Sequence, residues 1–324
     1  MTNGRLWGNR ERQVTLFFCY NLLLMILVTG GTGFIGQHLV RSLVRSGRPV
    51  RILLRPSAQS PNIPHGIPVE VAVSSLNDFK GLRAAMKDVD VVYHLAGSER
   101  HGSQANLNSV DVEGTRMVIQ AAAEAGVKHF IMLSHLGANR SSAFPVLKAK
   151  GIAEKWLIDS GMPYTIFRTD AVFGPGDQFS EPILKLLRRS PGIFLLPGQG
   201  DTVLQPLWVE DLVTCLTLTL EQPETRNRLF SVGGIELLTY REIVKQIAQK
   251  AGLHRLLIPY SLGHMRNLTL WVDQLVRDFP ISIFWLDTLA ENRTCTIDTM
   301  PREFGILPVR FNLANDHLLQ VKGK

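Results

Sequence analysis

One short segment, VTGGTGFIG at residues 28–36, constrains the fold of this chain more than any other feature. The apolar run Met25–Thr29 precedes its glycines, and residues 36–44 carry apolar side chains at the spacing of one helix face. Gly47 stands where a helix C-cap is expected, and Val50–Leu54 forms a second apolar run. The segment therefore predicts a complete strand–helix–strand unit.

The three glycines of this unit have the spacing of a pyrophosphate-binding loop. Gly30 permits a tight turn, Gly33 lets phosphates approach the backbone, and Gly36 lets the helix pack close to the sheet. The phosphates would lie at the helix N-terminus, where free N–H groups favour anions. An acidic residue after the second strand would favour NAD, but this chain has Arg55 there. A guanidinium suits a 2′-phosphate, so we expect NADP(H) to be favoured over NAD(H).

The apolar run before the glycines has a second interpretation, because residues 14–28 also mimic a signal peptide or membrane segment. A spanning helix needs about 20 apolar residues. Once Met25–Thr29 is assigned to a strand, only residues 16–24 remain, which is too short. We interpret residues 1–24 as an N-terminal extension, for which an upstream mis-start in the gene model is one explanation, and Met25 as the natural start of the domain. A short interfacial anchor is the alternative. We expect a cytoplasmic protein that is at most peripheral at a membrane.

Composition narrows the class of protein. The chain has 324 residues, of which 45% are hydrophobic and 19% charged, so we expect one large α/β domain with a smaller lobe. Its net charge of +7 is not carried by a dense basic block, so we expect no nucleic-acid partner. The cysteines Cys19, Cys215 and Cys295 are far apart, so we expect neither a metal site nor a disulfide framework.

Strands and helices alternate through the first half of the chain. Strands are expected at 69–73, 90–95, 129–134 and 164–168, and helices at 112–125 and 148–160. This alternation predicts an α/β fold with a doubly wound parallel sheet, in which ligands bind beyond the carboxyl ends of the strands. We expect a Rossmann domain over residues 25–175. Residues 176–324 should mainly form a C-terminal lobe, with segments around 203–235 returning to the Rossmann sheet.

The pattern changes after Gly174. We expect helices at 180–189, 240–251 and 267–277, and a glycine- and proline-rich loop at 191–205 that leads to a short strand. An apolar cluster at 279–289 contains Phe284 and Trp285. We interpret this cluster as core, and a patch for a partner or a membrane surface is the alternative.

Several longer motifs accompany the glycine loop. They are VRILLR (50–55), DVDVVYHLAG (88–97), VDVEGTRMVIQAAAEAGVKHFIMLSHLGA (110–138), KAKGIAEKW (148–156), FRTDAVFGPGDQF (167–179) and PLWVEDL (206–212). Together they resemble the extended and atypical short-chain dehydrogenase/reductases, which include NAD-dependent epimerases and dehydratases. Within that superfamily the chain is most similar to the NAD(P)H-binding subunit of respiratory complex I and its bacterial relatives, and next to NmrA-like proteins.

The resemblance implies a set of residues that contact the dinucleotide. They are Gly30, Thr32, Gly33, Phe34, Ile35, Gly36, Arg55, Leu95, Ala96, Gly97, Ser134, Lys150, Thr169 and Val172. The chain departs from the family pattern at Asp111, where Asn is usual, and at Thr169, where Pro is usual. Ser74 and Ser75 replace the usual Gly-Asp after the third strand, which puts the adenine contact in doubt.

The catalytic pattern of the superfamily is incomplete. It requires a Tyr four residues before a Lys, because the Lys lowers the pKa of the phenol that exchanges a proton with the substrate. Lys150 matches the lysine, but Val146 stands four residues earlier; in the alternative register Lys148 follows Phe144. The remaining catalytic candidates are Ser134 and Lys150, with His135 as a substitute acid. The alternative is that His135 merely packs at a strand end.

Three functions remain open at this stage. The first is an NAD(P)(H)-binding accessory or regulatory subunit, or a redox sensor, with weak or no catalysis because the tyrosine is missing. The second is an active NADP-dependent oxidoreductase, epimerase or dehydratase with substituted acid–base groups. The third is a membrane-anchored electron-transfer component, which only the N-terminal run suggests. The expected partners are a nicotinamide dinucleotide and either a respiratory-complex-like protein or a small-molecule substrate.

Overall fold

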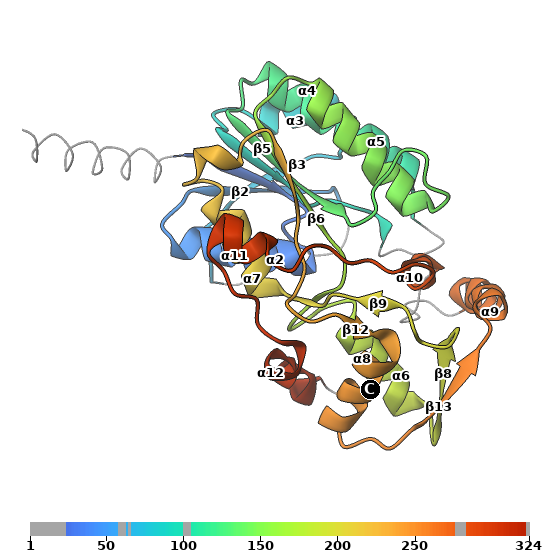
Figure 1. Ribbon diagram of the computed structural model, residues 1–324. Coiled ribbons are helices and arrows are strands. Elements are labelled where there is room, and N and C mark those ends of the chain that lie inside the picture. The colour runs from blue at the N-terminus through green and yellow to red at the C-terminus, as the bar shows by residue number, and fades with distance from the viewer. Residues whose placement is uncertain (1–23, 58–62, 64–65, 100–104, 276–282, 322–324) are drawn as a thin grey trace, which may run out of the picture.

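The computed structural model describes residues 24–57, 63, 66–99, 105–275 and 283–321 (Figure 1). Residues 1–23 of the expected extension, the end of the helix expected at 267–277, and the first part of the apolar cluster at 279–289 lie outside these residues. No helix in the described ranges is both long enough and apolar enough to cross a membrane.

The first part of the chain alternates strands and helices as expected. Its elements are β1 (Ile26–Thr29), α2 (Phe34–Arg45), β2 (Val50–Leu54), β3 (Glu70–Val73), α3 (Phe79–Ala85), β4 (Val91–His94), a π-helix (Leu107–Gly114), α4 (Thr115–Glu124), β5 (His129–His135), α5 (Pro145–Asp159), β6 (Tyr164–Thr169) and β7 (Val172–Phe173). Helix α5 begins three residues before the predicted start, because Pro145 occupies its first turn, where no N–H is needed.

The second part of the chain contains shorter elements. They are α6 (Ser180–Arg189), β8 (Ile193–Pro197), β9 (Val203–Leu204), β10 (Leu207–Trp208), α7 (Val209–Leu218), β11 (Arg228–Ser231), β12 (Leu238–Thr239), α8 (Tyr240–Lys250), β13 (Leu256–Tyr260), α9 (Leu262–Leu275), α10 (Ile283–Thr288), α11 (Thr299–Phe304) and α12 (Phe311–Ala314). Strands β10 and β7 pair in parallel, so the chain crosses back to the first part before α7 begins.

Seven parallel strands form the central sheet in the order β11-β6-β5-β4-β1-β2-β3. Helices α3, α4 and α5 cover one face, and α2 and α7 cover the other (Figure 1). Successive side chains of a strand point to opposite faces, so Ile26 and Val28 pack with α2 while Leu27 packs toward α3 and α4. This arrangement confirms the predicted doubly wound α/β fold.

A smaller lobe lies beyond the carboxyl ends of the strands (Figure 1). Its core combines side chains of α6 and α8 with Phe173, Phe194 and Phe311. The prediction of a loop throughout 191–205 was wrong, because β8 forms there and pairs in parallel with β13. A parallel partner some 60 residues away along the chain leaves no local hairpin signal in the sequence.

Candidate functional site

A cleft of about 430 Å³ lies between the carboxyl ends of the sheet strands and the smaller lobe. Every residue that the sequence associated with the dinucleotide lines it, and so do all three catalytic candidates, Ser134, His135 and Lys150. Brought together from separate segments, these residues form one continuous surface at the edge where doubly wound sheets bind ligands. Their roles in binding and catalysis stay predictions.

The glycine loop leaves room that any side chain would fill. Gly30 has φ +74°, and a Cβ there would lie 2.7 Å from the backbone nitrogen of Ala96. A Cβ on Gly36 would lie 2.1 Å from the carbonyl oxygen of Gly30, so the start of α2 can approach the loop only with glycine at this position. At Gly33 a Cβ would lie 3.2 Å from the same oxygen. The loop thus forms a backbone-lined cradle.

The cradle opens on the N-terminus of α2. Gly33 is the N-cap and provides no side-chain acceptor, and no acidic residue stands in the first turn. The first N–H groups of α2 can therefore serve an anionic ligand. Arg55 follows β2 directly, is exposed, and lines the same cleft. The backbone cradle and this helix N-terminus therefore fit the pyrophosphate of a nicotinamide dinucleotide.

Serine and asparagine side chains border the cleft after β3. Ser74 is buried, and its hydroxyl donates to the carbonyl oxygen of Ser75 at 3.1 Å. Ser75 and Asn77 also line the cleft, and the Asn77 side chain donates to the Ser109 hydroxyl at 2.7 Å. The segment that departs from the family's Gly-Asp pattern thus still borders the cleft with polar groups.

Only one of the two candidate lysines, Lys150, lines the cleft. Lys150 is buried in the cleft wall, whereas Lys148 is exposed on the outer side of α5. The Nζ of Lys150 lies 3.2 Å from Oδ1 of Asp111, whose Oδ2 accepts from the N–H of Ser98 at 3.1 Å and from its hydroxyl at 2.6 Å. Burial alone would lower the pKa of Lys150, but Asp111, Glu99 and Glu154 together raise it above the usual value. The ammonium is therefore held charged.

Asp111 is a functional candidate that sequence reasoning noted only as a departure from the family's Asn. It lies in the π-helix Leu107–Gly114, a rare element that often marks functional sites. A Cβ at Gly97 would lie 3.1 Å from Oδ1 of Asp111 and 3.2 Å from Nζ of Lys150. The strand end and this ion pair therefore meet at a position where a side chain would fit only tightly.

No phenol lines the cleft among the described residues. Val146 and Phe144 both line it, and neither carries a hydroxyl. The buried hydroxyls of Ser134 and Thr169 have no hydrogen-bond partner in the described part of the chain. Buried polar groups in folded proteins are nearly always paired, so these two hydroxyls are available to a ligand or to an ordered water.

His135 forms a pair with Glu99 in the cleft wall. Nε2 of His135 lies 2.7 Å from Oε2 of Glu99. Burial would raise the pKa of Glu99, but His135 and more distant cations outweigh burial and lower it to about 2. Nδ1 of His135 is buried and has no partner within the described ranges. Sequence reasoning named His135 but not Glu99, which follows Gly97 by two residues.

A second ion pair joins the two parts of the molecule. Arg293 reaches from the segment after α10 to Asp170, with Nη1 at 3.3 Å from Oδ1, and both side chains are almost fully buried. Its Nη2 donates to the carbonyl oxygen of Asp287 at 3.0 Å. Burial raises the pKa of Asp170, which Arg293 and His135 counteract in part. Sequence reasoning missed both residues because 123 positions separate them and no local pattern connects them.

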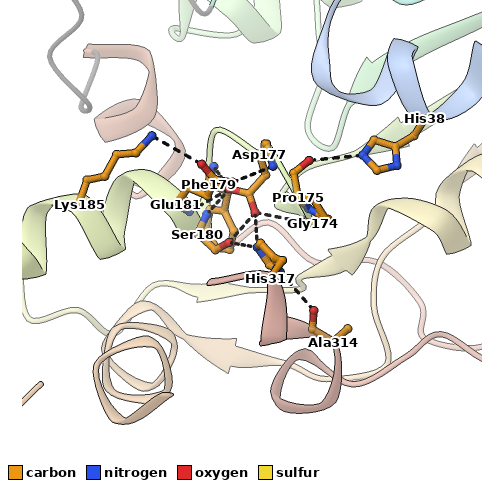
Figure 2. Close-up of polar contacts among 11 residues, drawn as sticks. His38, Gly174, Pro175, Asp177, Phe179, Ser180, Glu181, Lys185, Ala314 and His317 are labelled. Atoms are coloured by element: carbon orange, nitrogen blue, oxygen red, sulfur yellow. Dashed lines mark hydrogen bonds and ion pairs between the residues drawn. The ribbon is translucent and has the colours of Figure 1, made fainter. Parts of the chain in front are cut away.

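Asp177 anchors the loop that carries the cleft residues Gln178 and Phe179 (Figure 2). Its Oδ1 accepts from the backbone N–H groups of Phe179, Ser180 and Glu181 at 2.8–3.0 Å. His317 contacts Ser180 Oγ at 3.2 Å and Asp177 Oδ2 at 3.5 Å through the same nitrogen. A hydrolase triad needs the two imidazole nitrogens to contact different partners, so this buried cluster is a structural anchor of the cleft wall.

The expectation that Phe284 and Trp285 belong to the core was wrong in part. Both residues are half-buried and line the cleft, although Trp285 also packs edge-on against Tyr240 at 5.4 Å. The two neighbouring residues Leu286 and Leu289 are buried as predicted. Apolar periodicity cannot separate a core residue from a pocket residue, because both avoid bulk water.

We call the part of the cleft formed by the start of α5 and the smaller lobe the distal half. It consists of Glu99, His135, Phe144, Val146, Asp170, Phe179, Leu204, Phe284, Trp285, Asp287, Thr288 and Arg293. The other part, formed by the glycine loop, Arg55 and the strand ends down to Lys150, is the cofactor half. The fold and the cofactor half together define a Rossmann protein of the short-chain dehydrogenase/reductase class.

Comparison with known proteins agrees with this class. The sequence profile of a family described as NAD(P)H-binding matches residues 30–174. Sterol demethylase protein B from Methylococcus capsulatus is 40% identical over 280 residues, which cover 78% of this chain and 82% of that protein. The chain therefore belongs to the NAD(P)H-binding atypical short-chain dehydrogenase/reductase family.

One further relative and one solved structure are also similar to the chain. Mitochondrial NADH dehydrogenase [ubiquinone] 1 alpha subcomplex subunit 9 from Mus musculus is 27% identical over 308 residues, which cover 90% of this chain and 79% of that protein. The crystal structure of an NADPH-dependent quinone oxidoreductase from Escherichia coli superimposes with a TM-score of 0.72 at 19% identity, covering 91% of this chain and 100% of that one. The first confirms the predicted similarity to a complex I subunit, and the second shows a shared fold.

Proposed function

We propose that the cofactor half of the cleft binds NADP(H) in preference to NAD(H). The position of Arg55 carries this proposal, because an exposed guanidinium at the end of β2 can pair with a 2′-phosphate. The quinone oxidoreductase with the same fold is named as NADPH-dependent and was crystallised with NADPH, which supports the proposal.

Titration of NADPH and NADH against the wild type and Arg55→Ala tests the preference. A hydrogen-bonded charge contributes about 1.5–3 kcal/mol, so we expect Arg55→Ala to weaken NADPH binding by about 10- to 100-fold and to leave NADH binding unchanged. Arg45→Ala is the matched control, because Arg45 is exposed at the end of α2 outside the cleft. Equal affinities of the wild type for the two dinucleotides would contradict the proposal.

We further propose that the bound dinucleotide serves an accessory, regulatory or redox-sensing role with weak or no turnover of ordinary carbonyl substrates. Val146 carries this proposal, since an isopropyl group lines the cleft where the family has its phenol. Bound NADPH would supply a hydride, but the product oxygen also needs a proton, and a positioned general acid typically contributes about 10²- to 10⁴-fold. A relative named as a subunit of NADH dehydrogenase supports a role beside a protein partner.

A second candidate function is an active reductase in which His135 supplies the proton. The 2.7 Å contact between His135 and Glu99 favours it, because a carboxylate orients an imidazole and stabilises its protonated form. The 40%-identical relative is named sterol demethylase protein B, which supports an enzymatic role as well.

NADPH oxidation with a panel of ketones and aldehydes separates the two candidates. The non-catalytic role predicts NADPH binding without oxidation in the wild type, and activity that first emerges in Val146→Tyr. The reductase predicts oxidation in the wild type that His135→Ala reduces by about 10²-fold or more. His38→Ala is the matched control, because His38 pairs with Glu210 outside the cleft and should leave the rate unchanged.

A further inference from the structure

The distal half of the cleft combines an apolar wall with a small polar patch. The wall is formed by Phe144, Val146, Phe179, Leu204, Phe284 and Trp285. These side chains come from the start of α5, from the loop before α6, from β9 and from α10, so four separate segments converge on one apolar space. Binding is favourable when the apolar atoms of a ligand cover such a surface and remove it from water.

The charges of the distal half are compensated within the protein. Glu99 pairs with His135, and Asp170 pairs with Arg293. Asp287 pairs with Arg266, whose side chain approaches from α9. Lys150 is the cation at the boundary with the cofactor half, and it forms an ion pair with Asp111. Among the described lining residues, no cation of the distal half is left to neutralise a phosphate or a carboxylate.

The polar patch nevertheless has unused hydrogen-bonding atoms. Nδ1 of His135, Nε of Arg293 and Oδ2 of Asp287 are buried, and none has a hydrogen-bond partner in the described part of the chain. All three residues line the cleft. A ketone or alcohol oxygen of a ligand can accept a hydrogen bond from one of these nitrogens, and an alcohol can also donate one to the Asp287 carboxylate. Neither hydrogen bond requires a charge on the ligand.

From this combination we infer that the distal half binds an uncharged, predominantly apolar ligand with one or two ketone or alcohol oxygens, and that it rejects nucleotide sugars and carboxylates. The inference rests on the proposed dinucleotide occupying the cofactor half, which leaves the distal half for a second molecule. Desolvating a diphosphate or a carboxylate against a wall of aromatic rings is unfavourable, and without a free cation the contacts of the distal half cannot offset this penalty.

Isothermal titration calorimetry on the NADPH-loaded protein tests the inference with three probes. Progesterone is a neutral apolar diketone, cholate has a similar ring system with a carboxylate, and UDP-glucose carries a diphosphate. We expect progesterone to bind at least tenfold more tightly than either charged probe. Tighter binding of cholate or UDP-glucose, or no binding of progesterone, would overturn the inference.

Two variants locate the site. Phe284→Asp places a charge in the apolar wall and should weaken progesterone binding at least tenfold, with NADPH affinity unchanged. Phe284→Ala should weaken it less and serves if the Asp variant does not fold. Trp271→Ala is the matched control, because Trp271 is 69% exposed on α9 and does not line the cleft. Unchanged progesterone affinity in a folded Phe284 variant would contradict the location.

A third variant tests the charge compensation itself. Asp170→Asn removes the partner of Arg293 and leaves its guanidinium available to an anion. We expect the ratio of progesterone to cholate affinity to fall at least tenfold, and an unchanged ratio would contradict the role of ion pairing. The NADPH titration separates failure of the proposed function from failure of this inference. If NADPH does not bind, the proposed function fails. If NADPH binds but the charged probes bind more tightly than progesterone, only this inference is overturned.

Discussion

The two halves of the cleft are built by different means. The cofactor half is made mainly of backbone: a glycine loop, a helix N-terminus and strand ends, all within one continuous strand–helix–strand unit and its neighbours. The distal half is made of side chains that come from segments far apart in the chain and are joined by the Asp170–Arg293 pair. The comparison teaches that the cofactor half depends on close backbone approach, and the distal half on compensated charge.

Among the single substitutions, breaking the ion pair should have the largest effect, and it should spare the cofactor half. Arg293→Met leaves the Asp170 carboxylate buried without its partner, which typically costs about 3–5 kcal/mol of unfolding free energy. Urea unfolding of Arg293→Met, Asp170→Asn and the double variant forms a double-mutant cycle. We expect the double variant to be less destabilised than the sum of the singles. Additive losses would show that the pair is not coupled.

The complementary change breaks the cofactor half. Gly36→Ala introduces a Cβ 2.1 Å from the carbonyl oxygen of Gly30, so the loop or the helix must shift. We expect about 3 kcal/mol of destabilisation, at the upper end for overpacking, and at least tenfold weaker NADPH binding. Gly263→Ala is the matched control, since a Cβ there has no neighbour closer than 3.9 Å. NADPH affinity equal to that of the wild type would contradict the close-approach explanation.

The sheet beneath the cofactor half should respond to acid. His94 is buried, its two ring nitrogens are hydrogen-bonded to the hydroxyls of Thr29 and Thr115, and burial lowers its pKa to about 3. Burial similarly lowers the pKa of His129 to about 4. Below pH 6.5 the unfolded chain binds protons that the folded chain does not, so stability is lost as pH falls.

The size of this acid response can be measured by urea unfolding between pH 7 and 4. Each histidine should contribute about 1.4 kcal/mol per pH unit once the pH is below 6.5. His129→Gln should remove one of the two contributions and reduce the slope accordingly. A slope that is the same in the wild type and in His129→Gln would show that His129 does not titrate in this way.

The smallest effect concerns a single carboxyl in the distal half. The Glu99 carboxylate should titrate with a midpoint well below its usual pKa of 4.5, because His135 outweighs the effect of burial. ¹³C NMR of labelled glutamate follows this titration over the pH range in which the protein stays folded. The contribution of Glu99 to stability is present above its usual pKa of 4.5 and is lost as pH falls toward 2. His135→Ala removes the main favourable charge, so the midpoint should rise. A midpoint that does not move would contradict the pairing of Glu99 with His135.

The sequence by itself determined the cofactor half. The apolar run at β1, the glycine spacing and Arg55 after β2 lie within 30 consecutive residues or so, and local backbone geometry fixes their relation. The absence of the phenol could also be read from the chain, because Val146 and Lys150 are one helical turn apart on α5. The parallel order of strands followed from their alternation with helices.

Only the tertiary structure decided the distal half. The sequence already favoured Lys150 over Lys148, but only the folded chain shows that Lys150 is buried in the cleft wall, that Lys148 is exposed, and that Phe284 lines the cleft. The Asp170–Arg293 pair joins residues 123 positions apart. Sequence patterns indicate which side chains avoid water and which segments prefer a helix. Pairing between distant segments depends on how the two lobes pack against each other, and this packing leaves no local pattern in the sequence.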